Sequence, residues 1–471
     1  MLPGHASRSL QTCALILLAA CGSKPELPSE APSASGWRPP LDANLVVISI
    51  DTTRSDHFGC YGHTGPITPK IDRFALRSTR FSRAFTVMPT TLPAHTSLFT
   101  SQYPRQTGVN SNLGNVSEHE LTLAEILQEA GVTTGSFNSA QVLAAGTGLE
   151  QGFDEYQCPE NRTWPANKTC MMAREWITEN QDSRYFCFVH LYDPHALYEA
   201  PAAFQTKFEV EADGPLPPLE QFGFMAQPEG LTENLAADAA RAYAAEVAFA
   251  DAQIGALINM LAVSGQLKKT IVVITSDHGE TLDELADSYN YAYDHGEFLY
   301  TRELQIPLLI RVPAAFDIPI NQEIGDAVSL LDLMPTLLEL MGLPAPDGME
   351  GRSLVGRMRG EDLSPTVIVA ERHSYENPPN EWMKGDAYAL VSSPWLLLTS
   401  EGRGTELFQL DDDPAGVTNV AEENTAQVDK LKGRLEQWLE TRLPKDTRAA
   451  PEMLGSERDA AMRALGYNEG G

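Results

Sequence analysis

The sequence predicts an α/β fold with a mostly parallel central sheet, helices on both of its faces, and a small carboxy-terminal antiparallel α+β subdomain. Continuous apolar runs are typical of strands that a parallel sheet buries on both sides. They occur at residues 45–50, 185–191, 270–275 and 306–311. A long helical pattern separates the second run from the third, and strands that alternate with helices favour a parallel sheet covered on both faces.

Helix boundaries are predicted from capping residues. Thr68-Pro69 is typical of an N-cap followed by proline at the first helical position. Residues 122–125 form a capping box that opens a helix, and Gly131 ends it. In the long helix, apolar residues step by three and four through residues 243–261, as one buried face requires.

The predicted secondary-structure pattern changes after about Leu363. Short strand candidates at residues 366–370, 388–391 and 395–399 precede a helix whose apolar side carries Val428, Leu431, Leu435 and Trp438. We therefore divide the chain into a large α/β domain at 44–362, a carboxy-terminal subdomain at 363–443 and a tail at 444–471.

The amino terminus is predicted to be a targeting signal. Arg8 precedes a short apolar run, and Leu18-Ala19-Ala20-Cys21 resembles the lipobox of bacterial lipoproteins. Residues 1–20 are then a signal peptide, Cys21 carries the lipid anchor, and residues 21–43 form a Pro/Ser-rich tether. An ordinary secretory signal is the alternative. We expect a bacterial envelope protein that is attached to a membrane and faces the periplasm or the outside.

Composition excludes one class of partner. The chain has 471 residues, 42% of them hydrophobic, and a net charge of −30. Such acidity argues against nucleic-acid binding, which depends on Lys and Arg. Beyond the first twenty residues, we expect no apolar run that could cross a bilayer.

Four cysteines remain outside the signal, namely Cys60, Cys158, Cys170 and Cys187. Cys158 and Cys170 flank one loop and are candidates for a disulfide. Four thiols allow three pairings, and the sequence does not choose among them.

Polar residues follow two of the predicted strands. Asp51 comes directly after the first strand, and Asp277-His278 follows the strand at 270–275. Ligands bind beyond the carboxyl ends of strands in open α/β sheets, so these residues predict a site for a divalent cation with one nitrogen ligand. Taken alone, each aspartate is also an ordinary capping residue.

Residues 90–100 read as a loop entering a helix. Thr91 is predicted at the N-cap and Pro93 in the first turn. A helix N-terminus presents free N–H groups that bind anions. A hydroxyl there, beside a divalent ion, can attack phosphorus or sulfur, although Thr91 taken alone is typical of an ordinary cap.

Several ordered segments together resemble the sulfatase family of the alkaline phosphatase superfamily. The similarity runs from about Asn44 to Leu443. The segments that carry it are residues 44–62, 91–100, 276–280, 299–311 and 406–419.

This resemblance implies a set of roles. Asp51, Thr91, Asp277 and His278 would hold one divalent metal ion, either Ca, Mn, Zn or Mg, and Thr91 would also be the nucleophile. His195 is the first choice for the residue that protonates the leaving oxygen.

The other implied residues lie around the substrate. His190 is the second choice for protonating the leaving oxygen. His295 lies beside Gly296, which occupies the position of the family's substrate-binding lysine. Arg54 would bind or orient the anion. His95 and Thr52 replace the signature arginine and the second aspartate of the opening motif, and we assign them to the substrate as well.

A second metal ion is a further expectation, held by Asp193, His195 and His295 as in two-metal phosphodiesterases. We rank it below the one-metal site.

The nucleophile sets the expected chemistry. Sulfatases of the usual kind oxidise Cys or Ser to formylglycine, and Thr91 cannot be converted because its β-carbon bears a methyl group. The set of Asp, Thr, Asp and His resembles instead the branches of the superfamily that transfer phosphoryl groups.

We therefore expect a metal-dependent hydrolase of sulfate or phosphate esters that favours phosphoesters. The substrate is a small anionic ester, free or carried by a glycan or lipid, and specificity is expected from residues 158–170 and 201–229. The alternatives are a transferase of phosphoethanolamine or glycerophosphate type and a degenerate, non-catalytic binding lipoprotein.

Overall fold

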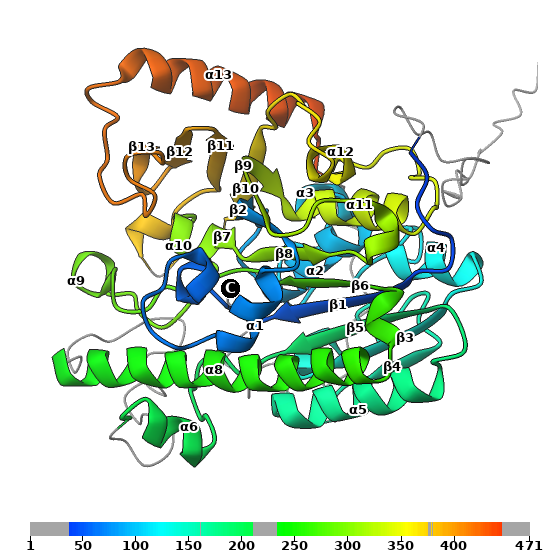
Figure 1. The fold of residues 1–471 in the computed structure, drawn as a ribbon. Helices are drawn as coiled ribbons and strands as arrows, with labels where there is room; N and C mark the ends of the chain where they lie inside the picture. The colour runs from blue at the N-terminus through cyan, green and yellow to red at the C-terminus, as the bar shows by residue number, and fades with distance from the viewer. Residues whose placement is uncertain (1–36, 161, 211–232, 375–377, 379, 445–471) are drawn as a thin grey trace, which may run out of the picture.

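The computed structural model describes residues 37–444 apart from 161, 211–232, 375–377 and 379 (Figure 1). The predicted signal peptide, the lipid-attachment residue Cys21, most of the tether and nearly all of the tail lie outside the described residues. So does most of the predicted specificity segment at 201–229.

The centre of the molecule is strand β1 (Asn44–Ile50), which is buried along its whole length. It lies between β5 (Tyr185–Leu191) and β6 (Thr270–Thr275), and both neighbours run parallel to it. All three strands are continuous apolar runs in the sequence, which is why they occupy the interior of the sheet. Their carboxyl ends therefore reach the same edge.

Within the described residues, this sheet has nine strands in the order β4-β3-β5-β1-β6-β8-β2-β7, with β9 paired to β2. The predicted strand at 306–311 is two short strands, β7 and β8, because Pro307 between them has no N–H to donate. Strand β8 runs antiparallel to β6 and β2. The remaining pairs around β1, β3 and β5 are parallel, so the predicted fold class is confirmed. The other strands of this sheet are β2 (Thr79–Phe85), β3 (Thr133–Asn138), β4 (Glu155–Gln157), β7 (Gln305–Ile306), β8 (Leu308–Arg311) and β9 (Gln322–Ser329).

Helices cover both faces of the sheet, as Figure 1 shows. Alternate residues of β1 point to opposite faces and enter separate apolar cores. One core includes side chains of α2 (Thr91–Thr100), α4 (Leu123–Glu129) and α11 (Leu333–Leu340). The other includes side chains of α1 (Pro69–Ala75), α5 (Ala166–Glu179) and α8 (Glu233–Val263). The remaining helices of this domain are short: α3 (Pro104–Thr107), α6 (Ala202–Lys207), α9 (Ala286–Tyr289), α10 (Thr301–Leu304) and α12 (Val355–Met358).

Helix α8 carries the apolar face that the sequence predicts. Its residues Tyr243, Val247, Ala250, Ile254, Leu257 and Leu261 are fully buried. By length and composition alone, α8 is the one helix of the described residues that is suited to cross a membrane. Its buried stripe against α5 and the sheet identifies it as a core helix instead.

The carboxy-terminal sheet is antiparallel and has the order β10-β11-β12-β13. The three predicted strands are confirmed within two residues, as β10 (Ile368–Arg372), β11 (Ala387–Ser392) and β12 (Trp395–Ser400). A fourth strand, β13 (Gly404–Gln409), completes the sheet and was not predicted. Helix α13 (Thr425–Thr441) packs on this sheet with the four predicted apolar residues buried.

The local signals have mixed outcomes. The capping box between Thr122 and Glu125 is present, and Thr68 precedes a helix that begins at Pro69. The candidate disulfide between Cys158 and Cys170 is not formed, because all four cysteines of the described residues are free. Cys170 lies in α5 and is buried in the core, so its thiol packs as an apolar group.

Asp251 joins two helices on one face of the sheet. From α8 it accepts hydrogen bonds from the N–H groups of Lys70 (3.0 Å) and Ile71 (2.7 Å) in the first turn of α1. Pro69 has no N–H, so Asp251 satisfies the donors that the helix itself leaves open. Burial raises the pKa of Asp251 from 3.8 to about 6.

We predict that Asp251→Asn removes a pH-dependent loss of stability. The folded-state pKa lies above the unfolded value, so the stabilising contribution is complete below about pH 4 and is lost as the pH rises through about 6. Asn keeps the acceptor without the charge. The free energy of unfolding of the variant should gain roughly 1 to 3 kcal/mol over wild type between about pH 4 and pH 7, measured by urea denaturation.

Asp251→Ala is the matched control. It should cost about 1 to 3 kcal/mol at every pH, because two backbone donors lose their acceptor. If the free energies of unfolding of wild type and Asp251→Asn depend on pH in the same way, Asp251 does not have the raised pKa assigned to it.

Candidate active site

The polar residues of the site converge at the carboxyl edge of the sheet. Asp51 follows β1, and Asp277-His278 follows β6, whose Thr275 pairs with Ser49 of β1. The ligand atoms of these three residues lie within 4.8 Å of one another, and all three side chains are fully buried. Thr91 Oγ1 lies 3.4 Å from His278 Nε2. The structure therefore brings together all four residues predicted to bind a metal ion.

The ring of His278 is held in one tautomer. Its Nδ1 lies 3.0 Å from the carbonyl oxygen of Gly279, and a carbonyl only accepts, so Nδ1 carries the hydrogen. Nε2 then presents a lone pair toward Asp277 Oδ2 at 3.3 Å and Asp51 Oδ1 at 3.8 Å. Burial lowers the pKa of His278 to about 3, so the ring is neutral.

Both carboxylates keep an oxygen that no protein group satisfies. Asp51 Oδ1 and Asp277 Oδ2 are buried and have no hydrogen-bond partner among the described residues. The second oxygen of Asp277 accepts from the N–H groups of His278 at 2.9 Å and Thr52 at 3.3 Å. Buried polar groups are normally paired, and these two face an imidazole lone pair. A divalent cation is the group that fits this donor set.

Thr91 is the first residue of α2, and the N-cap is Thr90, so the predicted cap lies one position too late. The extended backbone of Thr90 ends the loop, and Thr91 already has its place in the first turn. The N–H of Leu92 donates to Asn112 Oδ1 at 2.8 Å, and Pro93 has no N–H. Fewer free donors are therefore available for an anion than the sequence predicts, and the N–H of Thr91 itself is the first of them.

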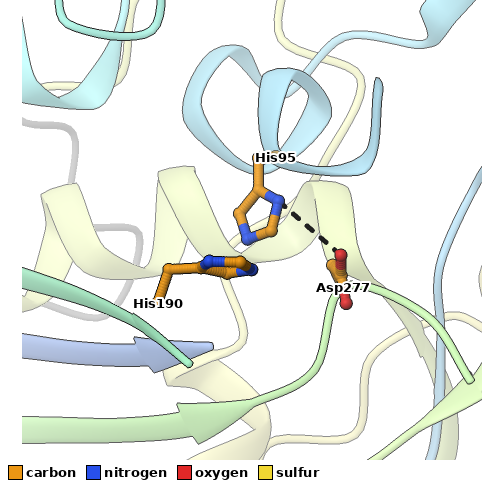
Figure 2. A group of neighbouring side chains, drawn as sticks. All are labelled: His95, His190 and Asp277. Carbon is orange, nitrogen blue, oxygen red and sulfur yellow. Dashed lines mark ion pairs between the residues drawn. The ribbon is translucent and has the colours of Figure 1, made fainter. Parts of the chain in front are cut away.

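His95 lies behind Thr91. Its Nδ1 lies 2.7 Å from the carbonyl oxygen of Thr91, and its Nε2 lies 3.0 Å from Ser49 Oγ. Figure 2 shows the ring descending from α2 toward Asp277, whose Oδ2 is 3.8 Å from Nδ1. Burial lowers the pKa of His95 to about 4. The ring thus joins α2 to β1 and has partners within the protein at both nitrogens.

Two of the residues predicted to meet the substrate have protein partners. Thr52 has a φ of 50°, and its N–H and carbonyl bind Asp277 and the hydroxyl of Tyr243. Arg54 is 9% exposed and pairs with Asp56 at 2.7 Å and Glu284 at 2.5 Å. Two carboxylates therefore neutralise its guanidinium group.

His195 and His295 form the rim of the cluster, with exposed fractions of 9% and 8%. Their ring centroids are 4.9 Å apart, and the His295 centroid lies 4.4 Å from that of His278. His195 Nδ1 donates to the carbonyl of Ala196 at 2.6 Å, and its ring stacks on Tyr192. Burial holds the pKa of His195 well below its ordinary value and lowers that of His295 to about 4.

Glu280 lies beside this rim and is a residue of the site that we did not predict from the sequence. Its Oε1 lies 3.3 Å from His295 Nδ1, and it is fully buried. Its position two residues after His278 was the available signal. Gly279 between them is required, because a Cβ there would lie 2.0 Å from the carbonyl oxygen of Arg302.

The predicted second metal site is not assembled. Within the described residues, the acidic and histidine clusters suited to a metal ion are His95-His190-Asp277 and Asp51-Asp277-His278. Neither contains Asp193, His195 or His295. Asp193 accepts a hydrogen bond from the N–H of Ala166 at 3.0 Å, so it binds the start of α5 instead.

We predict that metal affinity falls steeply below neutral pH. Burial raises the pKa values of Asp51 and Asp277 to about 7. A cation binds only the deprotonated carboxylates, so affinity is full above about pH 7 and falls as the pH drops, by up to roughly 100-fold per pH unit if two protons compete. Titration of metal-stripped protein with Zn²⁺ against a chelating dye, from about pH 5.5 to pH 8.5, measures this slope.

Asp277→Asn should reduce the pH dependence of the affinity to the slope expected when only one proton competes with the metal ion. Asp251→Asn, which removes a buried carboxylate far from the site, should leave it unchanged. An affinity independent of pH would contradict the proposed ligands.

The family model described as Sulfatase matches residues 43–343, and the model described as N-sulphoglucosamine sulphohydrolase, C-terminal, matches residues 290–442. The chain is 24% identical over 423 residues to a Delta 4,5-hexuronate-2-O-sulfatase of Bacteroides thetaiotaomicron, covering 81% of this chain and 85% of that protein. It is 31% identical over 208 residues to arylsulfatase K of Bos taurus, covering 42% of this chain and 35% of that protein.

Solved structures share the fold. A phosphonate monoester hydrolase of Agrobacterium radiobacter superposes with a TM-score of 0.71 at 19% identity, covering 85% of this chain and 96% of that one. A 2-O GAG sulfatase superposes with a TM-score of 0.69 at 20% identity, covering 91% and 97%.

Proposed function

Since this chain belongs to the sulfatase family and is a hydrolase acting on ester bonds, we propose that it cleaves a singly charged phosphorus ester with Thr91 as nucleophile. The observation that carries this proposal is the position of Thr91. Its hydroxyl begins α2 and lies 3.4 Å from His278 Nε2 inside the buried carboxylate cluster. Threonine cannot become formylglycine, so the attacking group is an unmodified alcohol.

The buried carboxylate cluster provides an acceptor for the hydrogen of the Thr91 hydroxyl. Burial raises the pKa of Asp51 to about 7, and the neighbouring His278 and a hydrogen bond from Thr91 lower it by less. Asp51 is therefore a carboxylate near Thr91 that can accept the hydrogen of the attacking hydroxyl. Asp51, Asp277, His278 and Thr91 would hold the divalent cation. When bound, it supplies positive charge that stabilises the oxygens of the transferred group.

Two displacements complete the reaction. The Thr91 Oγ–P bond forms while the bond to the leaving oxygen breaks; Asp51 takes up the Thr91 hydrogen, and the leaving oxygen takes a proton from solvent water. Water then attacks phosphorus, the Oγ–P bond breaks, and Thr91 regains its hydrogen. His195 holds its hydrogen at Nδ1 toward Ala196, so Nε2 offers a lone pair to the water; to protonate the leaving oxygen it must first take up a proton at Nε2.

The charge of the site supports a singly charged substrate. With a divalent cation, the charges of Asp51 and Asp277 leave the pocket near neutral. Burial keeps His278 and His295 uncharged, and Arg54 is neutralised by Asp56 and Glu284. A dianionic phosphate monoester would need more positive charge than these residues provide. Diesters and phosphonate monoesters carry one charge, and a phosphonate monoester hydrolase shares this fold.

We predict that Thr91→Ala lowers kcat/KM on phosphorus esters at least about 1,000-fold, because the covalent intermediate is lost. Thr91→Ser should retain much of the activity. Assays with 4-nitrophenyl phenylphosphonate, with metal content measured on each sample, check this. Thr90→Ala is the matched control, since its side chain makes no capping bond, and it should stay within several-fold of wild type. Activity that survives Thr91→Ala would sink the proposal.

Substrate charge gives a separate prediction. At about pH 8, kcat/KM for bis(4-nitrophenyl) phosphate should exceed that for 4-nitrophenyl phosphate by at least tenfold, because only the latter is a dianion. The value for 4-nitrophenyl sulfate, which is singly charged but has a sulfur centre, should be the lowest of the three. A preference for the dianion would contradict the near-neutral pocket.

A further inference from the structure

His190 lies deeper in the pocket than its predicted role requires. It belongs to β5, where it pairs with Ser49 of β1, and it is fully buried. Its Nε2 lies 3.1 Å from Asp51 Oδ2. Figure 2 shows the ring extending from its strand toward Asp277, beneath His95. The side chain therefore faces the carboxylates of the pocket.

Two clusters of potential ligands share one residue. Ligand atoms of His95, His190 and Asp277 lie within 4.8 Å of one another, and so do those of Asp51, Asp277 and His278. Since Asp277 belongs to both, the two clusters describe one buried pocket. A single cation in this pocket would therefore lie near ring nitrogens of both His190 and His278.

Hydrogen bonding separates the two extra histidines. His95 donates from Nδ1 to the carbonyl of Thr91, and its Nε2 lies against Ser49 Oγ, so neither nitrogen is left for a metal. His190 Nδ1 has no partner among the described residues, and the neighbour of its Nε2 is a carboxylate oxygen of the pocket. His190 is thus the histidine that can turn a lone pair toward the cation.

The spacing of the atoms fits shared coordination. Ligands that each lie about 2.1 Å from one ion are roughly 3.0 to 3.4 Å apart when adjacent in its shell. His190 Nε2 to Asp51 Oδ2 is 3.1 Å, His278 Nε2 to Asp277 Oδ2 is 3.3 Å, and Thr91 Oγ1 to His278 Nε2 is 3.4 Å. Three contacts around the pocket therefore have the separation of neighbouring ligands, whereas His278 Nε2 to Asp51 Oδ1 is longer, at 3.8 Å.

We propose that His190 is a metal ligand in its own right, and that the site binds a transition metal ion such as Zn²⁺ in preference to Ca²⁺ or Mg²⁺. This rests on the metal site of the proposed function and adds its second nitrogen ligand. Ca²⁺ and Mg²⁺ favour shells made of oxygen, whereas two imidazoles with carboxylates favour zinc and similar ions. The sequence had predicted one nitrogen ligand only.

Pulsed EPR of the Cu²⁺-loaded protein counts the imidazoles without any mutation. Two coordinated rings produce combination lines in the nitrogen modulation spectrum, and one ring does not. Wild type should show them, His190→Gln should lose them, and His95→Gln, which removes a buried ring 5.0 Å away, should keep them. A one-imidazole spectrum for wild type overturns the proposal, and so does a His190→Gln spectrum that still shows two.

Metal selectivity is the second measurement. His190→Asp replaces nitrogen by oxygen and should lower the ratio of Zn²⁺ to Ca²⁺ affinity at least about 100-fold, whereas a residue that only positions Asp51 would change both affinities alike. An unchanged ratio overturns the proposal. If Asp277→Ala leaves Zn²⁺ binding intact, the proposed site itself fails. Binding that depends on Asp277, with Thr91-dependent turnover but a single imidazole, would sink this inference alone.

Discussion

Two aspartates with unpaired oxygens share one buried pocket with the lone pair of His278, and the rest of the site is arranged around these unpaired groups. Buried like charges repel, and their desolvation is costly unless a cation or protons compensate them. Burial raises the pKa values of Asp51 and Asp277 to about 7 for this reason. A cation resolves the conflict, and in the proposed mechanism the same cation lies beside the hydroxyl of Thr91. Stability and chemistry thus depend on the same atoms.

The topology of the sheet brings these groups together at one edge of the sheet. Strand β1 has parallel neighbours on both sides, so the ends of β1 and β6 place Asp51 and Asp277 at one edge, with His190 on the adjoining strand. Helix α2 begins at that edge and adds Thr91. His95 and Asn112 then fix the first turn of α2 by binding the carbonyl of Thr91 and the N–H of Leu92. The hydroxyl is therefore held on a rigid element, and no mobile loop is needed to position it.

Sequence predicts the parts of this arrangement that depend on local pattern. Strands β1, β5 and β6 and helix α8 are strongly apolar or strongly periodic, and the position of Asp51 and Asp277 follows from the strands before them. Strands β3 and β9 were missed because TTGSFN and QEIGDAVS contain polar and small residues, and only neighbouring strands make them part of the sheet. The partners of Arg54 and Asp193 depend on distant segments, Glu284 and the start of α5, which no spacing in the chain reveals.

Charge acts on two length scales in this protein. The whole chain carries −30 and repels anions, but surface charges more than roughly 8 Å away are screened at physiological ionic strength. Inside the pocket, screening is weak, and the balance between one cation and two carboxylates decides what binds. Arg54 adds little to that balance, because Asp56 and Glu284 already hold its charge. In the proposed function, recognition of an anionic ester therefore rests on short-range contacts with the cation, the N–H of Thr91 and the rim histidines. A nearly neutral set of such contacts fits a group that brings a single negative charge.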